Sequence, residues 1–238
     1  MTRAHRDRFD HLLAQHQRLH DPLREPRNRL RWLGPLRQWQ AGRLERSFRH
    51  FLLDPQRAPA TAFFLGEVYG DRDFSRRDAD IARVVPKMQR LLPERLLTAV
   101  GDAIELGALT HALDLDTAQA LHALAPRGRR LDVPLYGEAY RLAGRSDDRA
   151  RQIELIGRVG RGLGDALQSG GVSKLLVFAR GPARLAGLNR LQGFLERGHA
   201  AFRALDDPVQ FVAGIERDER LVAERLFASD PDPFRFGD

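Results

Sequence analysis

The stretch SDDRARQIELIGRVGRGLGDAL, residues 146–167, carries the pattern that decides the fold. Its large apolar residues share one face of an amphipathic helix: Leu155, Ile156, Val159, Leu163 and Leu167. Ser146 precedes them at the place where a helix N-cap is expected. The stretch therefore predicts a long helix that is buried along one side.

The same stretch is the richest in glycine. A nucleotide-binding loop needs such glycines between a strand and a helix, but the residues before them have the helical pattern. Gly157, Gly160 and Gly164 instead fall on one helix face, where the missing side chains leave a shallow groove. We expect a neighbouring helix to pack closely into that groove, and we expect no phosphate-binding loop.

Helical periodicity extends over most of the 238 residues and is interrupted by Asp-Pro and Gly-Pro pairs. No segment alternates polar and apolar residues with enrichment in β-branched types, so strands are not expected. The predicted fold class is all-α, a single-domain irregular helical bundle of about nine to eleven helices. We expect the domain to span residues 1–228 and residues 229–238 to form an extended tail. The helix starts include Asp54-Pro55, Pro93, Asp114 or Asp116, and Asp207-Pro208.

Composition excludes several classes of protein. Hydrophobic residues make up 42% and charged residues 30% of the chain, which is typical of globular proteins. No apolar run approaches the roughly 20 residues of a membrane-spanning helix, and the N-terminus lacks the apolar core of a secretory signal. The absence of cysteine excludes disulfides and thiolate chemistry. We expect a cytoplasmic, bacterial protein with no transmembrane segment.

The formal net charge of +7 is concentrated near the N-terminus. Residues 1–50 hold 12 arginines and five acidic residues, whereas basic and acidic residues are equal in number in residues 51–238. Such a basic segment can attract nucleic acid or an anionic membrane surface. It can equally dock on an acidic face of its own body, and the sequence leaves both interpretations open.

Both tryptophans of the chain lie in this basic segment. Arginine can bind phosphate and tryptophan can stack on bases, so residues 24–49 contain the candidate residues for anion or nucleic-acid binding. These candidates are Arg27, Arg29, Arg31, Trp32, Arg37 and Trp39. The two tryptophans are one heptad apart, which favours packing into the body while the arginines point to solvent.

Metal and catalytic motifs are weak in this chain. Glu196 and His199 have the spacing of a carboxylate–imidazole pair on one helix face, but di-metal bundles need that pair twice. His16 and His20 are four residues apart, with only Asp21 as a nearby carboxylate. The chain has no nucleophile elbow, phosphate-binding Walker loop or zinc-protease motif. We expect no metal, no cofactor and no catalytic residue.

The stretch FFLGEVYGDRDFSRRD, residues 63–78, together with the block from Leu195 to Phe227, resembles a family of uncharacterised proteobacterial all-helical proteins. The signature of that family is F-F-L-x-x-x-Y-G-x-x-D-F-x-x-R-D. The resemblance covers residues of about 10–228. It implies an all-α fold, and it brings with it no activity, cofactor or catalytic residue.

The signature also gathers a phenol, three carboxylates and a guanidinium within ten residues, at an expected helix–loop–helix junction. These residues are Tyr69, Asp71, Asp73, Arg77 and Asp78. A helix that begins at Ser75 favours negative charge nearby, which gives the acids a structural use. The alternative is the polar rim of a ligand pocket.

Three hypotheses for function follow from the sequence. The leading one is a non-catalytic module that acts through an interaction surface, with a protein partner or as a homo-oligomer. The first alternative is a binder of a small-molecule or lipid-like ligand, or an enzyme, with a pocket between helices near Tyr69–Asp78. The second alternative is association with nucleic acid or an anionic membrane through residues 24–49.

Overall fold

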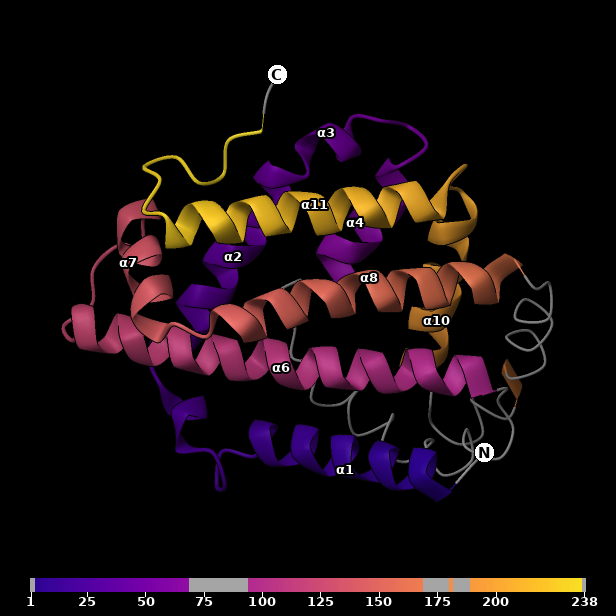
Figure 1. Ribbon diagram of the computed structural model, residues 1–238, viewed down its shortest axis with the longest axis horizontal. Coiled ribbons are helices and arrows are strands. Elements are labelled where there is room, and N and C mark those ends of the chain that lie inside the picture. The colour runs from indigo at the N-terminus through magenta and orange to yellow at the C-terminus, as the bar shows by residue number, and fades with distance from the viewer. Residues whose placement is uncertain (1–2, 69–93, 169–179, 182–188, 237–238) are drawn as a thin grey trace.

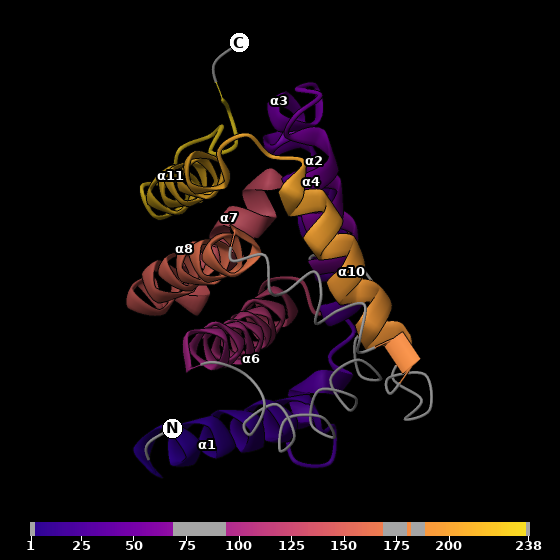
Figure 2. The ribbon, with the colours of Figure 1, turned by 90° about the vertical axis from the view of Figure 1, so that its right-hand side faces the viewer.

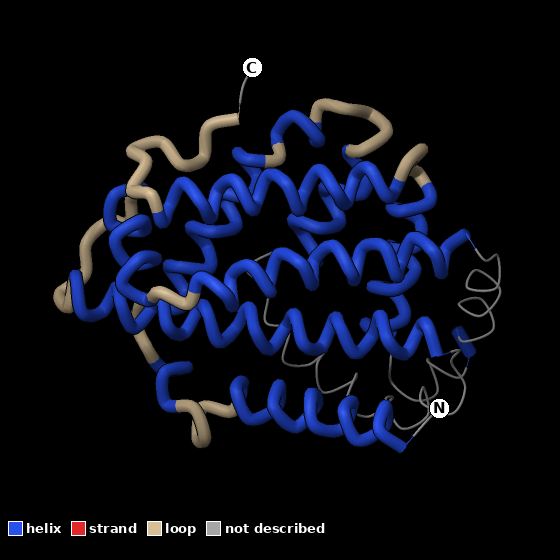
Figure 3. The backbone as a smooth tube through the Cα atoms, in the orientation of Figure 1, coloured by secondary structure: helices blue, strands red, loops and turns tan. Residues whose placement is uncertain are grey.

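The computed structural model describes residues 3–68, 94–168, 180–181 and 189–236. Every regular element in these ranges is a helix, as the tube in Figure 3 shows. The predicted all-α helical bundle is therefore confirmed. The elements are α1 (Arg3–His20), η1 (Pro26–Arg29), α2 (Leu33–Ser47), α3 (Arg49–Leu52), α4 (Ala58–Phe63), the π-helical turn η2 (Phe64–Val68), α6 (Glu94–Leu124), α7 (Val133–Ala143), α8 (Ser146–Gln168), α10 (Asn189–Arg203) and α11 (Pro208–Phe227).

The long helices form two layers. In the first layer α1, α6, α8 and α11 lie side by side in that order (Figure 1). In the second layer α2, α4 and α10 cross behind them, as the end-on view in Figure 2 shows. The short helix α7 returns from the end of α6 and closes one end of the bundle. The 31-residue α6 thus contacts helices from both halves of the chain.

The core lies between the two layers and has two main parts. One part joins α2, α6, α7 and α11 around the fully buried side chains of Leu36, Leu115 and Leu121. The other part joins α2, α3, α4, α8, α10 and α11 and is rich in phenylalanine, with Phe202 and Phe211 at its centre. Burial of these apolar faces is the main force that holds the helices together.

Helix α11 packs into the glycine groove of α8. A Cβ atom on Gly160 would lie only 2.5 Å from the Val212 side chain, and one on Gly157 would overlap the carboxylate of Glu216. On another face of α8, a Cβ atom on Gly162 would lie 2.9 Å from the Cβ of Ala99 in α6. The predicted close approach is confirmed at Gly157 and Gly160, where a side chain would not fit, whereas a Cβ atom on Gly164 would lie at an ordinary 3.7 Å from Pro208.

Two predicted helix starts are wrong. Helix α6 runs without a break from Glu94 to Leu124, so neither Asp114 nor Asp116 caps a helix. Asp54 begins a turn instead, in which its Oδ1 accepts a hydrogen bond from the Gln56 amide, and α4 starts only at Ala58. By contrast, the cap before α11 is confirmed: the Asp207 side chain accepts a hydrogen bond from the Gln210 amide at 2.9 Å.

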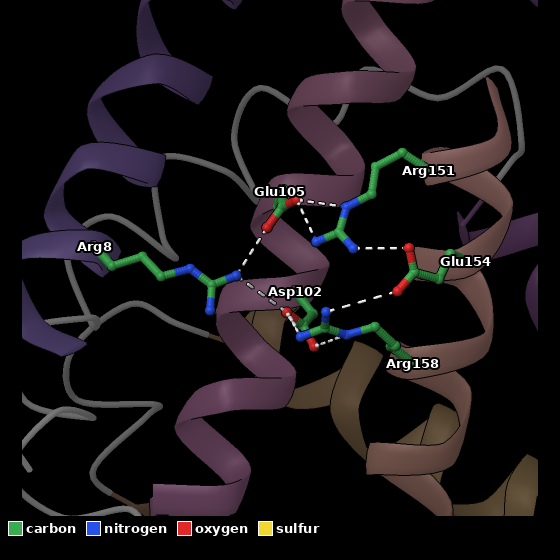
Figure 4. Close-up of polar contacts among 6 residues, drawn as sticks. All are labelled: Arg8, Asp102, Glu105, Arg151, Glu154 and Arg158. Atoms are coloured by element: carbon green, nitrogen blue, oxygen red, sulfur yellow. Dashed lines mark hydrogen bonds and ion pairs between the residues drawn. The ribbon is translucent and has the colours of Figure 1, made fainter. Parts of the chain in front are cut away.

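Ion pairs attach α1 to α6 and α6 to α8 (Figure 4). Arg8 in α1 lies 2.9 Å from Glu105 and 3.5 Å from Asp102, both in α6. Arg158 in α8 donates two hydrogen bonds to the buried Asp102, and Arg151 donates two to Glu105. The docking interpretation of the basic segment is confirmed for Arg8, because its charge faces carboxylates of the body.

Residues 228–236 contain no helix and fold back over the bundle. Phe234 packs against Trp39 and Tyr136, with ring centroids 5.8 and 6.2 Å apart, and the Arg43 guanidinium lies over its ring. The same guanidinium forms a buried ion pair with Glu219 of α11. The tail therefore covers one end of the part of the core that joins α2, α6, α7 and α11.

Among the helices that the structure describes, none combines the length and the apolar character needed to cross a membrane.

The glycine groove gives a matched pair of substitutions in one helix. Gly160→Ala should destabilise the protein by about 1–3 kcal/mol, because its Cβ atom would press into Val212. Gly164→Ala should be neutral or stabilise by up to about 1 kcal/mol, because the nearest atom to its Cβ lies at 3.7 Å and alanine favours a helix. Urea unfolding of both variants measures the difference. Equal effects at the two positions would contradict the close packing of α8 on α11.

Candidate functional site: a cationic pocket beside the C-terminus of α6

The structure pairs two of the candidate arginines with acids of the body. Arg27 lies 2.8 Å from Glu25 and 2.6 Å from Asp116 in α6. The hydrogen bonds from Arg27 lower the pKa of the Glu25 carboxyl to about 2. Arg37 lies 3.5 Å from the buried Asp114, which α6 also carries. The charges of Arg27 and Arg37 are thus neutralised mainly by acidic residues of the same molecule.

Both candidate tryptophans pack into the body. Trp32 is only 3% exposed, and its indole N–H donates a hydrogen bond to the carbonyl oxygen of Ala125 at 3.1 Å. Trp39 stacks on Tyr136 with the ring centroids 4.3 Å apart, and Phe234 contacts it from the tail. This arrangement agrees with the packing that the heptad spacing favoured.

Arg29 and Arg31 differ from these residues because both are exposed and neither forms an ion pair with a carboxylate of the described residues. Arg31 donates one hydrogen bond, from Nη1 to the carbonyl oxygen of Pro126 at 3.1 Å. Its partner is therefore a neutral carbonyl of the α6–α7 loop, and the positive charge of its guanidinium is not neutralised there.

A pocket of about 450 Å³ opens between the start of α2 and the α6–α7 loop, and we name it the Arg31 pocket. The loop lies at the left-hand edge of Figure 1. Three arginines and no acid line this pocket, and the other lining residues are apolar or glycine. The lining residues are Arg31, Trp32, Pro35, Gly128, Arg129, Arg130 and Leu131.

The loop that bears two of these arginines is held in place. Gly128 has a φ of +80°, and a Cβ atom there would overlap the guanidinium of Arg31, so glycine is needed for both reasons. The Gly128 amide donates a hydrogen bond to the Ala125 carbonyl, and Asp132 caps α7 through the Leu135 amide at 3.0 Å. These contacts thus fix the backbone of the loop.

Arg129 and Arg130 are the members of the pocket that the sequence analysis missed. Both are exposed, and Arg129 lies 3.8 Å from Asp132, whereas Arg130 forms no ion pair within the described part of the chain. Their signal was present as the run PRGRRL, residues 126–131. The equal totals of acids and bases in residues 51–238 concealed this local excess of positive charge.

The helix–loop–helix junction that the sequence offers as a ligand site is not among the described parts of the chain. Tyr69, Asp71, Asp73, Arg77 and Asp78 lie outside the described residues. A pocket near Tyr69–Asp78 therefore stays a prediction from the sequence.

The candidate metal ligands bind other groups in the structure. Glu196 accepts hydrogen bonds from Arg180 at 2.7 Å and from Gln192 at 2.8 Å. His16 and His20 stack on each other, and His20 stacks on His111 of α6, with centroids 4.2 and 4.0 Å apart. Within the described ranges no group of three or more histidine or acidic side chains is arranged to hold a metal ion.

The histidine stack sits where α1 meets α6, and its innermost ring is held neutral. His111 Nε2 lies 2.8 Å from Asn28 Oδ1 and 3.1 Å from the Leu19 carbonyl, so it donates, whereas Nδ1 accepts from Arg37 at 2.6 Å. Burial, followed by the nearby charges of His20 and Arg37, lowers the pKa of His111 to about 3. The ring can thus accept the hydrogen bond from Arg37 only while it is uncharged.

A family model described as "Domain of unknown function (DUF8198)" matches residues 19–233, and the chain therefore belongs to that family. The match includes every residue that lines the Arg31 pocket. Searches of curated proteins and of solved structures gave no match.

The neutral His111 predicts a pH dependence of stability. The pKa of this histidine is about 3 in the folded protein and 6.5 in a model compound, so the unfolded chain takes up a proton first as the pH falls. His111 should therefore favour unfolding by about 1.4 kcal/mol for each pH unit below about 6. Urea unfolding between pH 7 and pH 4 measures this slope.

The variant His111→Gln serves as the control for the carboxylates, whose protonation also reduces stability at the acidic end of this range. Its free energy of unfolding should fall less steeply between pH 6 and pH 5 than that of the wild type. Identical slopes in the two proteins would show that His111 is not held neutral by the fold.

Proposed function

We propose that the protein is a non-catalytic interaction module that binds an acidic segment of a partner protein at the Arg31 pocket. One observation carries the proposal: Arg31, Arg129 and Arg130 line one pocket that no acidic residue lines. A guanidinium group presents several N–H donors in a fixed plane, which match the two oxygens of a carboxylate. The pocket therefore suits a segment that carries aspartate or glutamate.

The environment of Arg31 supports the binding of an anion at this place. The C-terminus of a helix carries partial negative charge, which disfavours anions. Here the carbonyls of Ala125 and Pro126, which follow α6, already accept hydrogen bonds from Trp32 and Arg31. Among the described residues, the other N–H groups of Arg31 have no acceptor, so they are available to a ligand.

The positions of the tryptophans favour a protein partner over a nucleic acid. Single-stranded nucleic acid gains much of its binding energy from bases that stack on exposed aromatic rings. The ring of Trp32 is buried, and one face of Trp39 is taken by Tyr136. Arg27 and Arg37, two of the candidate phosphate-binding arginines, also already pair with acids of α6.

Reversal of charge in the pocket tests the proposal. The affinity for a fluorescently labelled oligoglutamate peptide should fall by about tenfold or more in the double variant Arg31→Glu/Arg130→Glu. The affinity of the wild type should also fall when the salt concentration rises from about 0.05 M to about 0.5 M, because exposed charges are screened. Fluorescence anisotropy measures both effects.

Arg220→Glu is the control for a charge reversal elsewhere on the surface, because Arg220 is an exposed arginine of α11 that does not line the pocket. It should leave the affinity for the peptide nearly unchanged. Three results would contradict the proposal: no binding of the peptide, equal losses in the pocket and control variants, or a labelled oligothymidylate that binds more tightly than the peptide in an Arg31-dependent way.

A further inference from the structure

Resting on the proposed function, we infer that the Arg31 pocket selects a short motif in which an apolar side chain stands next to a carboxylate, and that Leu131 determines this selectivity. Charge alone would bind any acidic segment. The lining of the pocket favours more than charge, because it combines apolar residues, which we call the floor, with three arginines, which we call the rim.

The floor of the pocket is apolar. Its lining includes Trp32, Pro35 and Leu131. The Leu131 side chain is half-buried against the part of the core that joins α2, α6, α7 and α11. The Trp32 indole N–H is already bound to a carbonyl, so the floor offers no donor from this ring to a polar group. A carboxylate placed on this floor would lose its water without gaining a partner.

The rim of the pocket is cationic. Arg129 and Arg130 are exposed, and Arg31 lies across Gly128 with its guanidinium fixed by the Pro126 carbonyl. A carboxylate at this rim can keep part of its hydration while it accepts hydrogen bonds from a guanidinium. The best ligand therefore places its charges at the rim and an apolar side chain on the floor.

The size of the pocket agrees with such a ligand. Its volume of about 450 Å³ falls in the range of small-ligand sites, and it is large enough for one leucine side chain with its flanking carboxylates. An apolar side chain that leaves water for this floor gains free energy in proportion to the area it buries. We expect one leucine per motif to raise the affinity by about tenfold.

Two labelled peptides of equal length and equal charge test the inference. In one peptide leucine separates the glutamates, and in the other serine takes the place of leucine. The wild-type protein should bind the leucine peptide about tenfold more tightly than the serine peptide. In the variant Leu131→Ser this preference should be lost, while the affinity for the serine peptide should stay as in the wild type.

Leu53→Ser is the matched control, because Leu53 is 72% exposed and lies after α3, and this variant should retain the preference. Leu131→Met, which keeps the volume and apolar character of the side chain, should retain it as well. Circular dichroism checks that each variant is folded, and the comparison of the two peptides on the wild type is decisive even if Leu131→Ser is unstable.

The outcomes separate this inference from the proposed function. Equal affinities of the wild type for the two peptides would overturn the inference and leave the binding of acidic segments intact. A preference that survives in folded Leu131→Ser would overturn the role of Leu131. If neither peptide binds, the proposed function fails together with the inference.

Discussion

Pairing between arginines of the first fifty residues and carboxylates of α6 is the interaction on which the rest of the arrangement depends. The pairs are Arg8–Glu105, Arg27–Asp116 and Arg37–Asp114. Each pair is partly exposed and is worth at most about 1 kcal/mol by itself. Together with the burial of Trp32 and Leu36, however, they fix how α1, η1 and α2 lie along a helix from a later part of the chain. Without these carboxylates, the arginines of the basic segment would repel one another at the surface of α6.

The same pairing distinguishes Arg31 from Arg8, Arg27 and Arg37 of the basic segment. Along most of α6, an arginine from the basic segment meets a carboxylate. Near the end of α6, Arg31 instead binds the backbone carbonyl of Pro126. Two further arginines of the pocket, Arg129 and Arg130, lie in the α6–α7 loop, where Gly128 permits the guanidinium of Arg31 to lie close to the backbone. The Arg31 pocket therefore gathers three arginines with no acidic residue in its lining.

The fold class and the glycine groove could be predicted from the sequence, because both depend on periodicity within one helix. The spacing of Gly157 and Gly160 indicated a close neighbour, although it did not show that the neighbour is α11. The ends of the helices could not all be predicted. Asp114 and Asp116 have side chains that often serve as N-caps, but in α6 they form ion pairs with arginines, and these tertiary contacts override local capping.

The pocket could be predicted only in part. Arg31 and Trp32 lay in the basic segment that the sequence indicated. Arg129 and Arg130 come close to them only because Arg31 binds the Pro126 carbonyl, 95 residues later in the sequence, and no local pattern indicates such a contact.

Amide hydrogen exchange of α1 tests most directly whether the basic segment is docked on α6 by these charges. We expect the amides of residues 9–20 to be protected in the wild type. We also expect the double variant Asp102→Asn/Glu105→Gln to lose protection in α1 to a greater extent than in α7 or α11, because Arg8 then has no carboxylate to bind. Exchange of α1 at the rate of an unfolded peptide in the wild type, or equal protection of α1 in the wild type and the variant, would contradict the account.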